Sequence, residues 1–287
     1  MAVEQASEGL NPLEHIVQHP LVTRPADAGL LTPNHQITLL SDQIVMMLVG
    51  GLLLVLLVPI LVRKRRAKDG IGSLVPAGAG NAIEFICAFL RKEVAEPALG
   101  HHTDRFIKYI WSLFFFVLTM NLMGVIPLGA VTPLFGTHIG GTPTGNVFVT
   151  GTLAVLTLLM MVVNGLRLGG KAYIAHLCPG PLWLAPLLVP LEIIGIFSKA
   201  FALAVRLFAN MIAGHILLAV LVGFILMAGK AMGAGGGIGV ALLSVPASVA
   251  ITVFEIAVAF LQAFIFTFLT TLFLGMSVNV HHEEHSH

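Results

Sequence analysis

Long runs of apolar residues, separated by short charged segments, organise this chain. The first run, Ile44–Val62, holds 19 residues without a charge. At ~1.5 Å per residue it is long enough to cross a hydrocarbon core of about 30 Å. Similar runs cover Ile110–Pro127 and Val147–Leu166. Each run predicts a membrane-spanning helix, because a backbone surrounded by lipid must satisfy its own hydrogen bonds.

The C-terminal part is apolar over stretches that are too long for upright spans. Leu191–Ala228 contains 38 residues, which is about 57 Å of helix, whereas an upright span needs only about 20 residues. Such a stretch either breaks into two short helices or forms one tilted helix, and the absence of proline within it favours one helix. Leu242–Val278 repeats the pattern. We therefore expect two long, strongly tilted helices, joined as a hairpin by a flexible segment at residues 228–239.

Residues 81–96 have a different pattern. Apolar side chains recur at helical spacing, at Ile83, Ile86, Cys87, Leu90 and Val94. Charged side chains interrupt them too often for a membrane span, at Glu84, Arg91, Lys92 and Glu93. This pattern predicts an amphipathic helix that lies at the cytoplasmic interface of the membrane.

The distribution of positive charge predicts the orientation. Arg63–Lys68 carries five positive charges in six residues, whereas the first 41 residues contain only Arg24. By the positive-inside rule, the basic cluster is cytoplasmic and the polar segment 1–41 is external. The uncharged segment 128–146 then forms an external loop, and five crossings place the tail after Val280 in the cytoplasm. A nucleic-acid site is the alternative for the basic cluster, but no aromatic residues are interleaved with it.

Composition supports the same class. Hydrophobic residues make up 57% of the 287 residues and charged residues only 10%, which cannot supply the surface of a soluble domain. The expected fold is an all-α polytopic membrane protein with about five crossing helices and one interfacial helix, its membrane domain covering residues 42–287. Neither a GxxxxGK[ST] nor a GxGxxG motif occurs. Cys87 and Cys178 have no metal-type spacing, so we expect no cofactor, no metal and no nucleic-acid partner.

Only five charged residues lie between Ala172 and Val280, namely Glu192, Lys199, Arg206, Lys230 and Glu255. A charge such as Arg206 in the middle of an apolar run costs about 2.5–3.5 kcal/mol on insertion scales, so it indicates function. The alternative is an arginine whose partners lie within the helix bundle. Glu192, Lys199 and Arg206 are seven residues apart, which returns to nearly the same helix face, and Asn210 follows one turn later.

A second polar pair lies on the last long helix. Glu255 and Gln262 are also seven residues apart, and His215 lies on the preceding helix. A carboxylate and an imidazole can both exchange protons, which predicts a proton relay. A single Glu–His hydrogen bond that only pins the two helices together is the alternative.

Three strings carry a resemblance to a known family. They are Ser198–His215 (SKAFALAVRLFANMIAGH), Leu261–Thr267 (LQAFIFT), and Asn121-Leu122-Met123-Gly124 leading to Pro127. The chain resembles subunit a of F-type ATP synthases from about residue 11 to about residue 278. The resemblance implies a non-catalytic membrane subunit that carries protons to and from a rotating ring of c subunits. The other partners that it implies are the peripheral-stalk b subunits, the rest of the ATP synthase complex and the lipid bilayer.

The same resemblance implies roles for individual residues. The arginine that matches Arg206 is essential and faces the ring carboxylate, with polar neighbours that match Asn210 and Gln262. Positions that match His215 and Glu255 belong to the half-channel open to the outer side. Those that match Glu192 and Ser198 belong to the half-channel open to the cytoplasm. Many bacterial members have Glu at the position of His215 and His at the position of Glu255, so this chain shows the exchanged arrangement seen in mitochondrial members.

Two other functions compete with this one. An ion-coupled secondary transporter would show inverted repeats, and an intramembrane metallopeptidase would show HExxH; the sequence contains neither. Histidines 281, 282, 285 and 287 form a solvated tail rather than a metal site. The polar N-terminal segment and the lack of a transit peptide favour the bacterial inner membrane over the mitochondrion.

Overall fold

A computed structural model of the chain describes residues 20–25, 36–62, 79–125, 143–170, 173 and 182–278. The basic cluster 63–68, the predicted external loop up to residue 142 and the histidine-rich tail lie outside the described residues. A short antiparallel hairpin pairs β1 (Pro20–Pro25) with β2 (Gln36–Ser41). The sequence pattern did not predict this hairpin, which lies within the segment expected to be external.

Four helices of the described part are long and apolar enough to cross a membrane. They include α2 (Asp42–Val62), α7 (Val147–Asn164) and α9 (Ala185–Val278). The fourth ends in α5 (Thr103–Val125). The all-α polytopic membrane class is therefore confirmed. The last two predicted segments are the two arms of α9 on either side of Gly233, so these four helices contain all five predicted crossing segments.

The predicted interfacial helix is longer and less regular than expected. It consists of α3 (Ala79–Phe89), a π-helical segment η1 (Leu90–Ala95) and α4 (Glu96–Leu99). It ends at Gly100, whose φ of 53° suits a residue without a Cβ atom. A 3₁₀ turn, η2 (Gly100–His102), then leads into α5. Exposed charged side chains gather over this region, where Arg91 pairs with Glu96 at 3.2 Å and with Asp104 at 2.7 Å.

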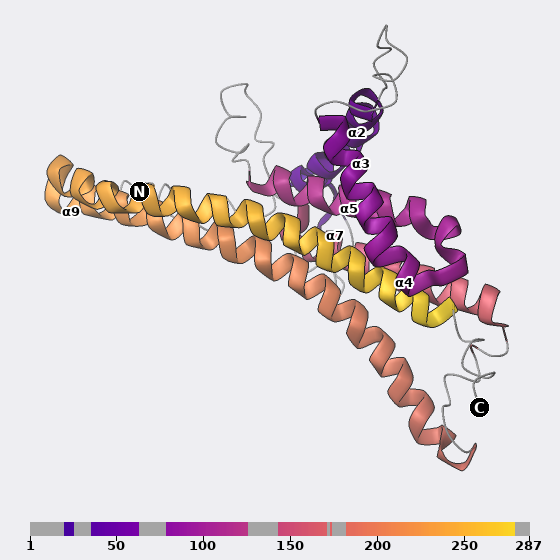
Figure 1. Ribbon diagram of the computed structural model, residues 1–287. Helices are drawn as coiled ribbons and strands as arrows, with labels where there is room; N and C mark the ends of the chain where they lie inside the picture. Colours follow the sequence, from indigo (N-terminus) through magenta and orange to yellow (C-terminus); the bar gives the residue numbers. More distant parts are fainter. Residues whose placement is uncertain are drawn as a thin grey trace, which may run out of the picture. The chain divides into compact units, whose positions relative to one another are not determined.

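The segment expected to be a flexible linker is helical, which corrects the prediction for residues 228–239. Helix α9 departs from helical geometry only at Gly233, with φ 71° and ψ −169°. The chain reverses its direction at this residue. A glycine suits the position, because a positive φ is unfavourable for residues with a Cβ atom. Close to this turn the arms lie side by side (Figure 1). A Cβ added to Gly237 would lie 3.1 Å from the Cα of Gly229, so glycine also permits the close approach of the two arms.

The chain divides into two compact units. The first contains residues 1–50, 119–150 and 206–261, and the second contains residues 51–118, 151–205 and 262–287. In the first unit, the Gln43 side-chain oxygen accepts a hydrogen bond from Asn146 at 2.7 Å, which joins the start of α2 to the start of α7. In the second unit, α5 and the end of α9 share a buried core. Its residues are Ala95, Leu99, Phe106, Ile107, Ile110, Leu274 and Val278.

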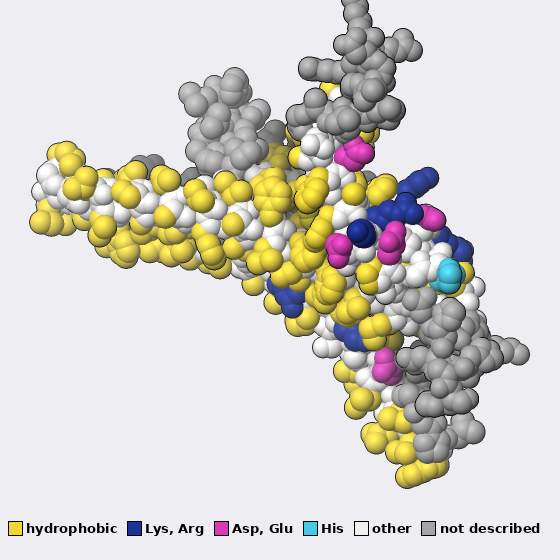
Figure 2. All heavy atoms as spheres, viewed as in Figure 1, with side chains coloured by type: hydrophobic (Ala, Val, Ile, Leu, Met, Phe, Trp, Pro, Cys, Tyr) yellow, Lys and Arg dark blue, Asp and Glu magenta, His cyan; other side chains and the backbone are white. Residues whose placement is uncertain are grey.

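Large apolar side chains are exposed along α2, α7 and α9, where a soluble protein would place polar ones. Figure 2 shows hydrophobic side chains along both arms of α9 near the turn, whereas Lys, Arg, Asp and Glu gather over a separate region of the same face. An apolar exterior with few charges matches the environment of lipid tails. The chain is therefore a multi-pass membrane protein.

The orientation predicted from the basic cluster can be tested by cysteine labelling. With Cys87 and Cys178 replaced by serine, a cysteine at Arg65 is expected to react with a membrane-impermeant maleimide only from the cytoplasmic side. A cysteine at Thr132 is the matched control and should react only from the outside. Labelling of both positions from one side would contradict the assigned orientation.

Candidate functional site

Arg206 lies on an uninterrupted part of α9, two helical turns beyond Lys199 and four beyond Glu192. Its side chain is exposed, and none of the residues that the structure describes forms an ion pair or a hydrogen bond with it. The alternative of an arginine satisfied within the bundle therefore has no support among the described side chains. An unpaired guanidinium on an apolar helix is costly in lipid, so it calls for a partner other than the described side chains.

Small side chains flank Arg206 on the helix surface. Ala202, Ala209 and Ala213 are all exposed, at positions four before, three after and seven after the arginine. These spacings place them on the same face as Arg206. A partner helix can therefore approach this face closely, because alanine leaves the backbone nearly uncovered.

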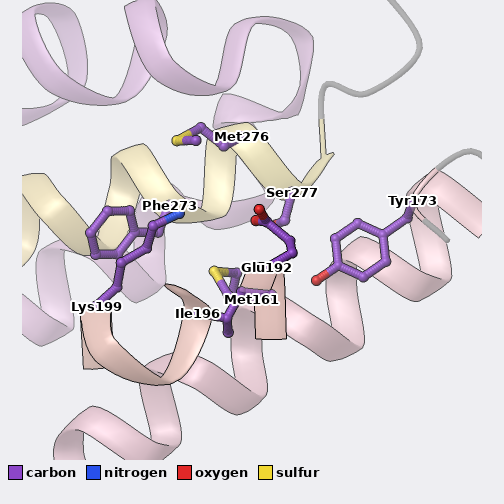
Figure 3. Close-up of a pocket in the computed structure, with 8 residues that line it drawn as sticks. All are labelled: Met161, Tyr173, Glu192, Ile196, Lys199, Phe273, Met276 and Ser277. Carbon is purple, nitrogen blue, oxygen red and sulfur yellow. The ribbon is translucent and has the colours of Figure 1, made fainter. Parts of the chain in front are cut away.

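Glu192 lies in a small cavity within the second unit, drawn in Figure 3. The cavity has a volume of about 40 Å³, which is enough for about three or four waters at about 10–15 Å³ each. The lining residues are Met161, Tyr173, Glu192, Ile196, Lys199, Phe273, Met276 and Ser277. This cavity brings two of the predicted polar residues, Glu192 and Lys199, to one place.

Lys199 and Ser198 differ in their surroundings. The Lys199 ammonium lies 5.5 Å from the centroid of the Phe273 ring, a cation–π distance that holds a charge beside an apolar helix. Ser198 is exposed and does not line the Glu192 cavity. The structure therefore does not bring Ser198 together with Glu192, although the resemblance placed both in one half-channel.

Sequence reasoning missed Tyr173, which comes after the π-helical segment η5 (Gly165–Gly169). Burial raises the pKa of the Tyr173 hydroxyl, and the negative charge of Glu192 raises it further. The hydroxyl therefore stays protonated near neutral pH and can donate a hydrogen bond. No sequence motif indicated a role for this tyrosine. The one signal in the sequence was the pair of nearby glycines in η5, against which the tyrosine packs.

Glu255 occupies the first unit, on the arm of α9 that follows the turn. Its side chain is buried, and neither carboxylate oxygen has a hydrogen-bond partner among the described residues. The carboxyl group packs directly against Gly214, where any Cβ atom would collide with it. The Nε2 atom of His215, the next residue, is buried and also lacks a partner in the described part of the chain.

These contacts bear on the two alternatives for Glu255 and His215. The carboxyl group of Glu255 reaches the helix turn that carries His215, so the structure brings the pair into one neighbourhood. The Glu–His hydrogen bond of the pinning alternative is not formed, because both Glu255 oxygens are without a partner among the described side chains. Buried proton-binding atoms without a hydrogen-bond partner are unusual, and such groups concentrate at functional sites.

The predicted amide residues have separate surroundings. Asn210 is half-buried on α9 in the first unit. Gln262 is buried in the second unit, and its side-chain nitrogen has no partner among the described residues. Asn121 of α5 donates a hydrogen bond of 3.4 Å to the carbonyl oxygen of Ala259, one turn beyond Glu255. Asn121 thus ties α5 to the Glu255 arm within the first unit.

The described residues contain no candidate metal-binding site. No three His, Cys, Asp or Glu side chains come together there as a metal-binding group. The four histidines of the tail lie outside the described residues. The described residues thus provide several proton-binding groups, an arginine without an ion pair and a small cavity lined in part by Glu192 and Lys199, all in an apolar helical scaffold.

Comparison with known proteins gives consistent matches. The family model described as "ATP synthase A chain" matches residues 44–275. The chain is 41% identical over 220 residues to "ATP synthase subunit a" of Myxococcus xanthus (strain DK1622), an alignment that covers 75% of this chain and 67% of the relative. It is 38% identical over 283 residues to "ATP synthase subunit a" of Anaeromyxobacter sp. (strain Fw109-5), covering 96% of this chain and 61% of the relative.

A third relative, "ATP synthase subunit a 2" of Prosthecochloris aestuarii (strain DSM 271 / SK 413), is 41% identical over 248 residues, which cover 86% of this chain and 70% of the relative. The chain thus spans between about half and about two thirds of the length of most of the curated relatives that it matches. All three relatives come from bacteria.

Proposed function

Because this chain belongs to the ATP synthase A chain family, we propose that it is the proton-translocating membrane subunit of an F-type ATP synthase. The observation that carries the proposal is Arg206, a guanidinium exposed on an apolar helix, with no partner among the described residues and with alanines on either side. A ring of c subunits that brings a carboxylate to this face would supply the missing partner. Pairing the guanidinium with a carboxylate in this way offsets the cost of placing its charge in lipid.

Protons reach the ring from the outer side through Glu255 and His215. The Glu255 carboxyl oxygens and the Nε2 atom of His215 are buried and have no hydrogen-bond partner among the described residues, so each group can accept and release a proton without breaking such an interaction. A protonated ring carboxyl is neutral and can turn into lipid, whereas moving a charged one into lipid is strongly unfavourable. Rotation therefore follows protonation.

Protons leave on the cytoplasmic side through the cavity at Glu192. Its volume and the polar side chains in its lining, which include Lys199 and Ser277, suit a short chain of waters. Arg206 lies between this route and the outer one along α9, where its positive charge stabilises the deprotonated ring carboxylate and repels a proton that would leak across. Asn210, one turn after Arg206, and Gln262, a buried amide of the second unit, are further polar residues of the proposed proton path, and Ser198 provides a hydroxyl beside Lys199 at the surface.

The remaining partners follow from the same proposal. The chain itself forms and breaks no covalent bonds and needs no cofactor; ATP is made by the catalytic head of the complex. Peripheral-stalk b subunits hold the chain still against the turning ring. The location is the inner membrane of a bacterium.

Purification of the complex tests the proposed function. Affinity capture of this chain in mild detergent is expected to bring an oligomeric ring of small subunits and the peripheral stalk. Capture of the chain alone, as a monomer or a small oligomer with solute-transport activity, would instead support a secondary transporter and contradict the proposal.

Glu192→Gln is expected to slow proton flow through the assembled complex without preventing assembly. Glutamine keeps the shape and the hydrogen-bonding capacity of the side chain but loses the titratable charge. The reduction should stay below about tenfold, or ~1.4 kcal/mol in the barrier, because water in the cavity can still carry protons. Glu93→Gln, at an exposed position of η1, is the matched control. Unchanged proton flux across the whole pH range would remove Glu192 from the path.

A further inference from the structure

Tyr173 is held in place by two glycines one helical turn apart. A Cβ atom at Gly165 would lie 2.7 Å from Cε2 of the tyrosine ring, and one at Gly169 would lie 2.8 Å from the Cβ of Tyr173. Both distances are shorter than ordinary carbon contacts, so only glycine leaves room for the ring. The tyrosine is therefore buried, and packing against these glycines fixes the orientation of its ring.

The fixed ring directs its hydroxyl toward Glu192. In Figure 3 the Tyr173 oxygen points at the glutamate from the side of the cavity opposite Lys199 and Phe273. Glu192 is close enough for its charge to act on the hydroxyl, yet no direct hydrogen bond joins the two groups. Polar groups that face each other across a small cavity are commonly bridged by a water.

The composition of the cavity wall singles out this pair. Met161, Ile196, Phe273 and Met276 are apolar, and the Ser277 hydroxyl already donates a hydrogen bond of 2.8 Å to the carbonyl oxygen of Leu274. Lys199 is the other charged side chain among the described lining residues. Among the described lining residues, Tyr173 is therefore the neutral side chain whose hydrogen-bond donor is available to act toward the Glu192 carboxylate across the cavity.

We propose that Tyr173 is a positioning residue of the proton exit, whose hydroxyl holds a proton-carrying water against Glu192. The inference rests on the proposed function, and it assigns to the route a residue from outside the helix that carries Glu192. The Glu192 carboxyl group passes its proton to the bridging water, which passes one on toward the cytoplasm. The Tyr173 hydroxyl keeps its own proton and donates a hydrogen bond to the bridging water, which in turn donates one to the carboxylate left behind and stabilises it.

Tyr173→Phe in the intact complex tests this role, because phenylalanine keeps the ring on Gly165 and Gly169 and removes only the hydroxyl. Loss of the donor should favour the protonated form of Glu192. The midpoint of proton release on the cytoplasmic side is therefore expected to move to higher pH, by up to about one pH unit, a change of up to tenfold in proton affinity. Passive proton flux through vesicles that hold the membrane sector should fall at the original midpoint and recover at higher pH.

Tyr109→Phe is the matched control, since Tyr109 is the other tyrosine of the chain, is partly buried, and does not line the cavity. It should leave the pH profile unchanged. In a background of Glu192→Gln, Tyr173→Phe should have no further effect, because the group on which it acts is gone. A pH profile of Tyr173→Phe that matches that of the unmodified chain would overturn the proposal, as would an equal effect with and without Glu192.

The two levels of the proposal fail in different ways. If the chain conducts no protons in the complex at all, even without substitutions, the proposed function is wrong. If the unmodified complex conducts protons and Glu192→Gln slows them, but Tyr173→Phe behaves like Tyr109→Phe, then only the role of Tyr173 is wrong.

Discussion

Replacement of Arg206 with alanine is expected to abolish ATP synthesis driven by proton flow, while the complex still assembles. The guanidinium is exposed and forms no ion pair with the described residues that would hold α9 in place, so its removal should not unfold the described structure. The substitution would remove the fixed positive charge that this face offers to the ring carboxylate. Synthesis in inverted membrane vesicles should fall to background, and subunit content by gel electrophoresis should stay unchanged.

Arg206→Lys should fail as well, because a compact ammonium cannot reproduce the two-pronged donor geometry of a guanidinium toward a carboxylate. Lys230→Ala is the matched control: it removes an exposed cation from the same arm of α9, near the turn at Gly233, and should leave synthesis nearly intact. Robust synthesis by the Arg206→Lys variant would contradict the role assigned to the arginine.

Replacement of Glu255 with glutamine is expected to produce the second largest defect. The carboxyl group is buried against Gly214, and neither oxygen has a partner among the described residues, so glutamine fits the same space but can no longer bind and release a proton. Proton transfer by a placed acid or base contributes about 10²–10⁴-fold to proton-transfer reactions, so flux should fall by more than about tenfold. Passive proton flux through reconstituted membrane sectors measures the defect directly.

The double variant His215→Glu, Glu255→His tests whether the two residues act as a coupled pair or independently. If the groups relay protons to one another, the exchange should recover more flux than either single change, and its pH profile should differ from both. Glu96→Gln, which alters an exposed carboxylate paired with Arg91, is the control and should have little effect. Single defects that simply add in the double variant would show that the residues act independently.

Hydrophobicity alone was sufficient to predict the fold class. A run of apolar residues long enough to span the lipid core leaves the backbone no alternative to a helix. The bounds of α2 and α7 and the end of α5 therefore lie within a few residues of the predicted ones. Helix α5 begins seven residues earlier than predicted, at Thr103. The long C-terminal arms were also predictable, because no proline lies between Leu191 and Ala228 in the first of them. The place of the turn was not. Several glycines lie between residues 229 and 239, and the sequence cannot tell which of them takes the positive φ that Gly233 has.

The site was predicted less completely than the fold. A charged residue within an apolar run is costly and therefore rare, which is why Glu192, Arg206 and Glu255 could be named as candidates from the sequence. Their neighbours could not, since contacts between distant segments depend on packing. Gly214 matters because the Glu255 carboxyl group packs against it, and Tyr173 because η5 has room for its ring. Both residues are ordinary in sequence and distinctive only in three dimensions.

The central claim is that Arg206 faces a ring of small subunits. A photoreactive amino acid at Ala209, exposed one turn from Arg206, tests it most directly, with Phe148 of α7 as a second exposed position for comparison. After illumination of native membranes, the Ala209 variant is expected to form an adduct with the small subunit that carries the ring carboxylate, and the Phe148 variant is expected to form none. An Ala209 adduct that contains only lipid, or a different protein, in membranes whose complex is fully assembled would contradict the account.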